Sequence, residues 1–192
     1  MYVITADQRG SRTSHDLVPE ALAGIEHLGG DSLLLQPART AGDEIQALIA
    51  DASAALSIAL MLTRSGSWSV GLGIGDVEVP LPDDVRAARG PAFFEARDAV
   101  NRAKKSSCRI AVSPTDAEAF IRLLVELRDR RSAEGWEVYD LLATGMTQRS
   151  VAHELGISEG AVSLRVSAAG IRLEQDTIPS LIRALEDTSP HP

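Results

Sequence analysis

Residues 145–170 read GMTQRSVAHELGISEGAVSLRVSAAG and contain two short helical patterns separated by a glycine. That glycine, Gly156, can adopt the positive φ that a tight turn between helices requires, and Ile157 would fill the turn. Ser158 is a typical N-cap for the second helix. The apolar positions that would face inward are Val151, Ala152, Leu155, Val162 and Val166. This spacing predicts a helix-turn-helix.

A further helix is expected directly before this pair. The segment GWEVYDLLATG, residues 135–145, offers Trp136 and Val138 for packing against the two helices. The three helices together predict a compact all-α domain over residues 133–175. A short helix and a flexible tail are expected over residues 176–192.

The run resembles the DNA-binding helix-turn-helix of sigma-factor region four, in which TQxxVAxxLGIS is followed by AVSxR. In such folds the second helix enters the major groove of double-stranded DNA. The resemblance implies binding as a homodimer, because one module makes few phosphate contacts. The residues that it assigns to DNA binding are Thr147, Gln148, Arg149, Ser158, Glu159, Gly160, Ser163, Leu164 and Arg165. The alternative is that the three helices dock a protein or form a dimer.

The charge of the chain limits the kinds of partner. The formal net charge of the 192 residues is -8, which argues against indiscriminate coating of nucleic acid. Among the predicted segments, residues 142–172 alone carry more basic than acidic side chains. No apolar run is long enough to span a membrane, and the first residues lack the features of a secretory signal, so we expect a cytoplasmic protein. The single cysteine, Cys108, excludes an internal disulfide.

Residues 113–131 read SPTDAEAFIRLLVELRDRR and predict an amphipathic linker helix within residues 113–132. The apolar residues at helical spacing are Phe120, Leu123, Leu124 and Leu127. This stripe could pack on its own domain, or it could pair with the same helix of a second copy.

Residues 1–112 alternate between strand and helix patterns, which predicts an α+β domain. The predicted strands are residues 2–6, 32–36, 44–50, 68–74 and 108–112, and the predicted helices are residues 19–28, 52–64 and 92–105. With a hairpin turn at residues 41–44, this order predicts a ferredoxin-like β-α-β-β-α-β sheet domain, which the all-α helix-turn-helix domain follows.

Two carboxylates would converge at one end of this sheet. Asp7 ends the first predicted strand and Asp43 lies at the tip of the hairpin. Paired carboxylates suit Mg²⁺, whose remaining positions are filled by water and nucleotide phosphate. The alternative is that both are ordinary turn and capping residues.

The loop after Asp7 offers groups for a triphosphate. Its backbone amides, its flexible glycine and its two guanidinium groups would form a cradle for phosphate oxygens. The residues of this cradle are Gln8, Arg9, Gly10, Ser11 and Arg12.

These motifs resemble the class III nucleotide cyclase and GGDEF catalytic domains. GDEIQ at residues 42–46 is similar to their acidic hairpin, and WSVGLGIG at residues 68–75 is similar to their glycine-ended central strand. ARDAVNRAKK at residues 96–105 is similar to a helix whose lysine contacts phosphate. The resemblance implies nucleotide-binding roles for Glu44 and Lys104, and GTP or ATP with Mg²⁺ as ligand.

The sequence departs from those enzymes where the transition state is stabilised. Ala41 replaces the first glycine of the GGDEF hairpin, and Phe93 and Phe94 lie near the position of the Asn of a class III cyclase. Metal and phosphate ligands remain, whereas groups that stabilise developing charge do not. This favours nucleotide binding without efficient turnover, so the chain is not expected to be an enzyme.

The whole arrangement resembles the SatD family, in members that carry an additional DNA-binding tail. The resemblance implies a transcription regulator whose N-terminal domain binds a purine nucleoside triphosphate. Two alternatives stay open: an active nucleotide cyclase or nucleotidyltransferase with a DNA-targeting domain, and a ligand-free dimerisation scaffold for the helix-turn-helix.

Overall fold

The computed structural model describes residues 1–11 and 13–188 and divides into two compact units. The first unit comprises Met1–Val125 with Leu181–Pro192, and the second comprises Glu126–Ser180. Both boundaries fall inside helices, namely α4 (Glu118–Asp129) and α8 (Ile171–Thr188). The expected division after residues 112, 132 and 175 therefore differs from the observed one, because α4 and α8 each contribute to both units.

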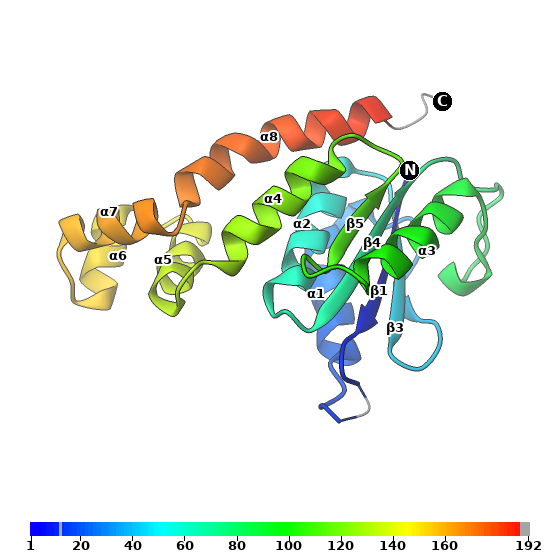
Figure 1. Ribbon diagram of the computed structural model, residues 1–192, viewed down its shortest axis with the longest axis horizontal. Coiled ribbons are helices and arrows are strands. Elements are labelled where there is room, and N and C mark those ends of the chain that lie inside the picture. The colour runs from blue at the N-terminus through cyan, green and yellow to red at the C-terminus, as the bar shows by residue number, and fades with distance from the viewer. Residues whose placement is uncertain (12, 189–192) are drawn as a thin grey trace. The chain divides into compact units, whose positions relative to one another are not determined.

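The first unit is an α+β structure built on a mixed sheet, which has five strands among the described residues in the order β2-β3-β1-β4-β5 (Figure 1). The strands are β1 (Tyr2–Gln8), β2 (Ala38–Arg39), β3 (Glu44–Ile49), β4 (Trp68–Ile74) and β5 (Ile110–Ser113). Strand β1 is antiparallel to both β3 and β4, and β5 is parallel to β4.

Helices cover both faces of this sheet. They are α1 (Val18–Gly29), α2 (Ala52–Arg64) and α3 (Pro91–Ala103), with short 3-10 turns at Gly30–Ser32 and Val85–Ala87. Figure 1 shows α3 on one face and α1 and α2 on the other. Because side chains alternate along a strand, Val3 packs with α3 whereas Ile4 points to the opposite face. None of the helices among the described residues is long and apolar enough to cross a lipid bilayer.

The strand expected over residues 32–36 is wrong. That segment forms a single bridge, from Leu33 to Ile49, and the strand that pairs with β3 in the hairpin is Ala38–Arg39. Gln36-Pro37 precedes β2, and proline has no amide hydrogen for a ladder, so pairing begins only after it.

Helix α3 lies directly on the backbone of β4. A Cβ atom at Gly71 would lie 2.3 Å from the backbone nitrogen of Val100 and 2.4 Å from the carbonyl oxygen of Ala96. At Gly73 it would lie 2.2 Å from the carbonyl oxygen of Ala92. These distances are shorter than any packed Cβ contact, so the two glycines permit the close approach of α3 to the sheet.

We therefore expect Gly71→Ala to force α3 away from β4 and to lower the free energy of unfolding by about 1–3 kcal/mol or more. Urea denaturation measures this change. The matched control is Gly160→Ala in the second unit, where the new Cβ would meet only Ser158 Oγ at 3.8 Å. That change should leave stability unchanged or raise it by up to about 1 kcal/mol. Equal effects of the two substitutions would contradict the close-approach argument.

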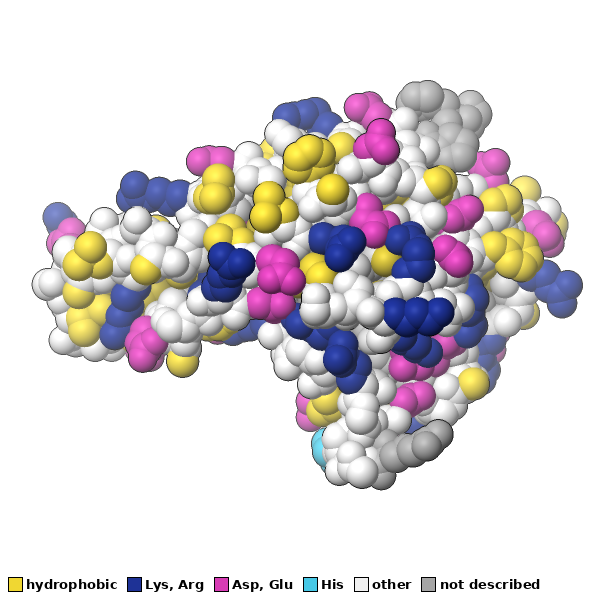
Figure 2. Space-filling view, viewed as in Figure 1, with side chains coloured by type: hydrophobic (Ala, Val, Ile, Leu, Met, Phe, Trp, Pro, Cys, Tyr) yellow, Lys and Arg dark blue, Asp and Glu magenta, His cyan; other side chains and the backbone are white. Residues whose placement is uncertain are grey.

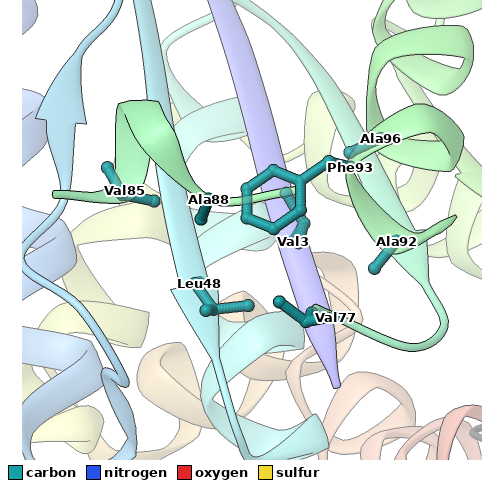
Figure 3. Packing of buried hydrophobic residues seen from close by; sticks show 8 residues of the cluster. All are labelled: Val3, Leu48, Val77, Val85, Ala88, Ala92, Phe93 and Ala96. Carbon is teal, nitrogen blue, oxygen red and sulfur yellow. The ribbon is translucent and has the colours of Figure 1, made fainter. Parts of the chain in front are cut away.

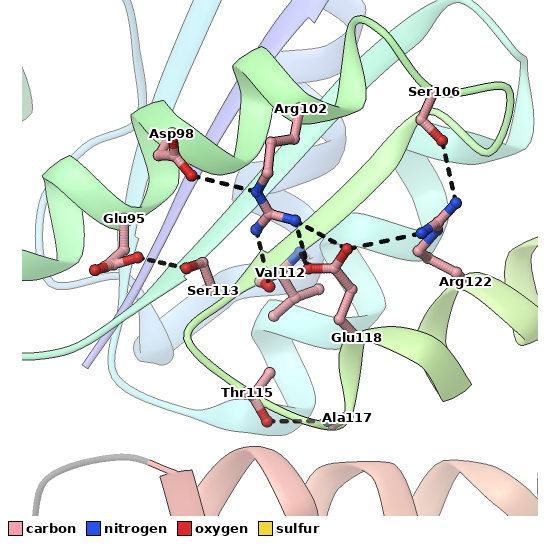
Figure 4. A network of polar contacts seen from close by, with 10 residues as sticks. All are labelled: Glu95, Asp98, Arg102, Ser106, Val112, Ser113, Thr115, Ala117, Glu118 and Arg122. Atoms are coloured by element: carbon pink, nitrogen blue, oxygen red, sulfur yellow. Dashed lines mark hydrogen bonds and ion pairs between the residues drawn. The ribbon is translucent and has the colours of Figure 1, made fainter.

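Charged side chains form hydrogen bonds with backbone groups on the outer edge of β5, which has no neighbouring strand among the described residues (Figure 4). Arg102 of α3 donates to the carbonyl oxygen of Val112 at 3.2 Å, and the Val112 amide donates to Glu118 at 3.2 Å. Arg102 also binds both carboxylate oxygens of Glu118, at 2.9 and 2.7 Å. Figure 2 shows the resulting mixture of basic and acidic side chains over α3. This network replaces the missing neighbour strand and protects the edge from pairing with another chain.

The apolar stripe expected along the linker helix is only partly correct. Helix α4 buries Ile121 and Val125 in the first unit, whereas Phe120 and Leu123 are 62% and 67% exposed. The helix begins at Glu118, whose carboxylate belongs to the β5 network. The first half of α4 is therefore part of the sheet unit and not a free linker.

The expected short helix and tail after residue 175 also differ from the structure, because Ile171–Thr188 is one helix. Its last turns belong to the first unit and bury Leu181 and Leu185. The Tyr2 hydroxyl donates to the Leu185 carbonyl at 3.2 Å. The end of the expected flexible tail, residues 189–192, lies outside the described residues.

Leu185→Ala should lower the free energy of unfolding by about 2–5 kcal/mol, because the fully buried side chain leaves a cavity. Leu173→Ala on the same helix is the control, since Leu173 is 61% exposed. Thermal and urea unfolding of the full chain compare the two. A Leu185 variant as stable as the Leu173 variant would mean that the end of α8 is not part of the first unit.

The second unit contains three short helices: α5 (Ala133–Ala143), α6 (Gln148–Leu155) and α7 (Glu159–Ala168). Each begins at a hydroxyl N-cap, and the caps are Ser132, Thr147 and Ser158. Gly156 ends α6 with φ of 64°, as the turn between α6 and α7 requires. The shared core consists of Val138, Val151, Ala152, Val162, Val166, Ala169 and Ile171.

Candidate functional site

The end of β1 and the turn of the β2-β3 hairpin lie side by side. The Gln8 amide donates to the Asp43 carbonyl at 3.2 Å, and the antiparallel register pairs Asp7 with Glu44. Gly42, with φ of 61°, allows the tight turn that presents Asp43. The topology thus brings the two predicted carboxylates to one end of the sheet.

A cavity of about 370 Å³ opens at this end of the sheet. Thr13 and Ser69 line it, together with most of the residues that were expected to bind metal or nucleotide. Those expected residues are Asp7, Gln8, Arg9, Gly10, Ser11, Asp43 and Lys104. Arg12, which belongs to the same expectation, lies outside the described residues. The loop before α1 and the residue after α3 therefore meet around one cavity.

Lys104 forms an ion pair with Asp7, with 2.7 Å between Nζ and Oδ2. Lys104 directly follows α3, and its amide still donates to the Val100 carbonyl, so the close packing of α3 on β4 determines its position. The side chains are 38% and 22% exposed. The cavity therefore carries a cation and an anion that offset each other.

The Gln8 side chain is buried and stabilises the loop between β1 and α1. It is 2% exposed, and its Nε2 donates to Ser14 Oγ at 3.0 Å and to the His15 carbonyl at 2.6 Å. Its Oε1 accepts from the Leu17 amide at 3.0 Å. With both ends of the carboxamide engaged, Gln8 shapes the loop in which Arg9 is exposed.

Glu44 is buried beneath α3. Arg97 binds its carboxylate at 2.7 Å, and Thr40 Oγ1 donates to it at 2.7 Å. Because a buried and paired carboxylate is not free to contact a ligand, the nucleotide-binding role expected for Glu44 has no support in this geometry. Arg97 was not expected from the sequence, although it precedes Lys104 by seven residues and so lies on the same face of α3.

A second cavity, of about 340 Å³, shares Gln8, Ser11 and Asp43 with the first. Its wall includes an ion pair between Arg39 and Asp16. The hydrogen bond from Arg39 lowers the pKa of Asp16 below its ordinary value. No local pattern in the sequence indicates this pair, because the two residues are distant along the chain.

The donor set can be compared with the needs of Mg²⁺. Magnesium in proteins is commonly bound by one or two carboxylates together with phosphates and water. Asp7 and Asp43 meet that number, but Lys104 already offsets one negative charge. Among residues 1–11 and 13–188 no group of three or more His, Cys, Asp or Glu side chains could hold a metal. Two carboxylates at this cavity are too few to bind a metal ion by themselves, so Mg²⁺ would need further ligands such as phosphate oxygens and water.

In the second unit, α7 presents the side chains that were expected to read DNA. Glu159, Gly160, Ser163 and Leu164 are exposed, Leu164 to 73%, whereas Val162 and Val166 are buried. The hydroxyls of Thr147 and Ser158 accept from the amides of Ser150 and Ala161, at 3.1 Å each, so they cap α6 and α7. Gln148 opens α6 and is half-buried.

The two arginines expected to contact phosphate are in ion pairs. Arg149 binds Glu159 at 3.0 Å, and Arg165 binds Glu137 of α5 at 2.9 Å. The Arg149 side chain is 84% exposed, so solvent screens this pair and a phosphate could displace the glutamate. Arg165 is 29% exposed and lies against α5, which makes it the less available of the two.

A buried ion cluster in the second unit was not expected from the sequence. Arg128 and Arg131 both bind the carboxylate of Glu174, which is 1% exposed. The Arg131 guanidinium also lies 4.4 Å from the ring centre of Trp136. Arg131 Nε donates to the Ala169 carbonyl at 3.0 Å. The cluster thus connects the end of α4, helix α5 and the start of α8 within this unit.

Glu174→Gln should lower the free energy of unfolding by about 3–5 kcal/mol, because it removes the buried negative charge that both Arg128 and Arg131 bind. Asp176→Asn, an exposed acid two residues further on α8, is the control and should have little effect. Circular dichroism during thermal unfolding compares them. Similar melting curves for both variants would contradict a stabilising role for the cluster.

Comparisons of this chain with family models, with curated proteins and with solved structures give no match.

Proposed function

We propose that the chain is a DNA-binding transcription regulator whose first unit binds a purine nucleoside triphosphate with Mg²⁺ without efficient turnover. The single observation that carries the DNA-binding part is helix α7, whose buried and exposed residues alternate as in a helix-turn-helix. The capped helices and the left-handed Gly156 are consistent with that fold.

The strand order supports a ferredoxin-like first unit. A β-α-β-β-α-β chain path, with β1 between β3 and β4, is the order expected of that fold, and β5 extends it. Nucleotide cyclases and GGDEF domains, which the sequence resembles, place acids at the corresponding strand end and hairpin. The cavity shared by Asp7, Asp43 and Lys104 supports a similar use here.

In this proposal Asp7 and Asp43 would hold Mg²⁺, which neutralises phosphate charge when bound. Lys104 would exchange Asp7 for a phosphate oxygen, and Arg9 and the Gly10 backbone would contact the remaining phosphates. The absence of a transition-state residue in the cyclase-like motifs supports binding in preference to turnover. Homodimerisation is part of the proposal, and the exposed Phe120 and Leu123 of α4 are candidates for that contact.

The DNA-binding part is tested by selecting duplexes from a random library with the full chain and measuring affinity by fluorescence anisotropy. Leu164→Ala should weaken binding to a selected duplex about tenfold or more, because losing one base contact costs about 1–3 kcal/mol. Leu28→Ala on α1 in the first unit is the matched control and should bind normally. No enrichment of any duplex, or equal binding by both variants, would reject DNA recognition by α7.

The nucleotide part is tested by calorimetric titration with ATP and GTP in Mg²⁺. Asp43→Asn is the informative variant, since Asp43 has no ion pair among the described residues whereas changing Asp7 would strand Lys104. It should weaken binding at least tenfold, and the exposed Asp83→Asn should not. Pyrophosphate release would indicate an active enzyme instead, and no binding of either nucleotide would leave a ligand-free scaffold.

A further inference from the structure

Another cavity, of about 420 Å³, lies in the first unit beside α3. Its described lining shares no residue with the two cavities around Asp43. The groups that give it chemical character are Gln46, Arg86, Arg89, Phe93, Phe94 and Arg97. Its volume lies in the range of about 300–1,000 Å³ that is usual for small-molecule sites.

An apolar cluster keeps the inner part of this cavity in shape. Figure 3 shows the Phe93 ring among Val3, Leu48 and Ala88, between α3, the sheet and the segment that contains Val85. Phe93 is 8% exposed. The next residue, Phe94, is 75% exposed and belongs to the same lining. Phe93 is therefore part of the packed wall of the cavity, and the ring of Phe94 is accessible to a ligand.

A buried amide faces into the cavity without a partner. Gln46 of β3 is 8% exposed, and its side chain makes no hydrogen bond within the described residues. Its cross-strand neighbour is Thr5, whose buried hydroxyl also has no partner there. Leaving the Thr5 hydroxyl unpaired costs about 1–3 kcal/mol. The Gln46 carboxamide is not among the fully buried unpaired groups, so its polar atoms are open to the cavity. A ligand with a donor and an acceptor on one edge would satisfy the Gln46 carboxamide.

The cavity has an excess of positive charge. Arg97 binds Glu44, and Arg86 binds Asp84 through Nε and Nη2. The hydrogen bonds from Arg86 lower the pKa of Asp84 to about 2, so that pair stays ionised at neutral pH. Arg89 has no ion pair within the described residues. Since the described lining holds no acidic side chain, Arg89 is available to an anion that enters the cavity.

We propose that this cavity binds a mononucleotide without a metal ion. Gln46 hydrogen-bonds the edge of the base, Phe94 stacks on its face, and Arg89 binds the phosphate. The described lining contains three arginines and no acidic side chain, so it offers no carboxylate to a cation. The inference is independent of the proposed triphosphate site, whose residues it does not use.

The test is calorimetric titration of the full chain with AMP, GMP, CMP and UMP in EDTA. At least one should bind with a stoichiometry of one per chain, and Gln46→Leu and Arg89→Ala should each weaken it at least tenfold. Arg130→Ala, an exposed arginine of the second unit, is the matched control and should bind within twofold of the unaltered chain. Thermal unfolding of each variant checks that it is folded.

Three results would overturn the proposal: no binding of any of the four nucleotides, equal binding by all variants, or inorganic phosphate binding as tightly as the nucleotide. Self-association that Phe94→Ala abolishes, without nucleotide binding, would identify the surface as an interface between copies and also reject it. Asp43→Asn should bind the mononucleotide within twofold of the unaltered chain. Asp43→Asn is also the variant that should lose binding of the triphosphate in Mg²⁺. Failure of the triphosphate proposal and failure of the mononucleotide proposal therefore give different results.

Discussion

The contact between α3 and the bare backbone of β4 determines where the charges of the first unit lie. Gly71 and Gly73 let the helix rest on the strand, and small residues such as Ala96 complete the fit. That contact fixes the height of α3 above the sheet, and with it the positions of Arg97 and Lys104. A bulkier strand would move both cations away from the acids that they meet. The candidate site thus depends on two residues that cannot themselves contact a ligand.

Acids in both units are balanced by cations that come from distant parts of the sequence. In the first unit, the cross-strand neighbours Asp7 and Glu44 receive Lys104 and Arg97, which are seven residues apart along the chain. In the second unit, a single buried glutamate, Glu174, binds two arginines. The Asp7–Lys104 pair is partly exposed and open to exchange with a phosphate, whereas the Glu174 cluster is buried and serves the fold. Burial therefore separates a candidate binding group from a structural one.

Local patterns in the sequence predicted the local features of this protein. The spacing of apolar residues around Gly156 and the caps at Thr147 and Ser158 depend on neighbours along the chain, so those helices were predictable. The convergence of Asp7 and Asp43 could be predicted because pairing of the hairpin with β1 brings the hairpin turn next to the end of that strand. The ion-pair partners, the unpaired Gln46 and the position of β2 depend on tertiary contacts, which periodicity does not encode. The continuity of α8 across residue 175 is not encoded in the local pattern, which includes Pro179. The packing of Leu181 and Leu185 stabilises the helix beyond that proline.

The first unit is built from two parts of the chain that the ribosome synthesises at different times. Its sheet is encoded before residue 125, but Leu181 and Leu185, which complete its packing, are translated only after the whole second unit. Since synthesis proceeds at about 5–20 residues per second, the partial first unit must wait several seconds with an apolar surface uncovered. The second unit is one continuous segment, so its sequence is complete before that of the first unit. The order of folding on the ribosome is therefore expected to be the reverse of the order in which the two units begin.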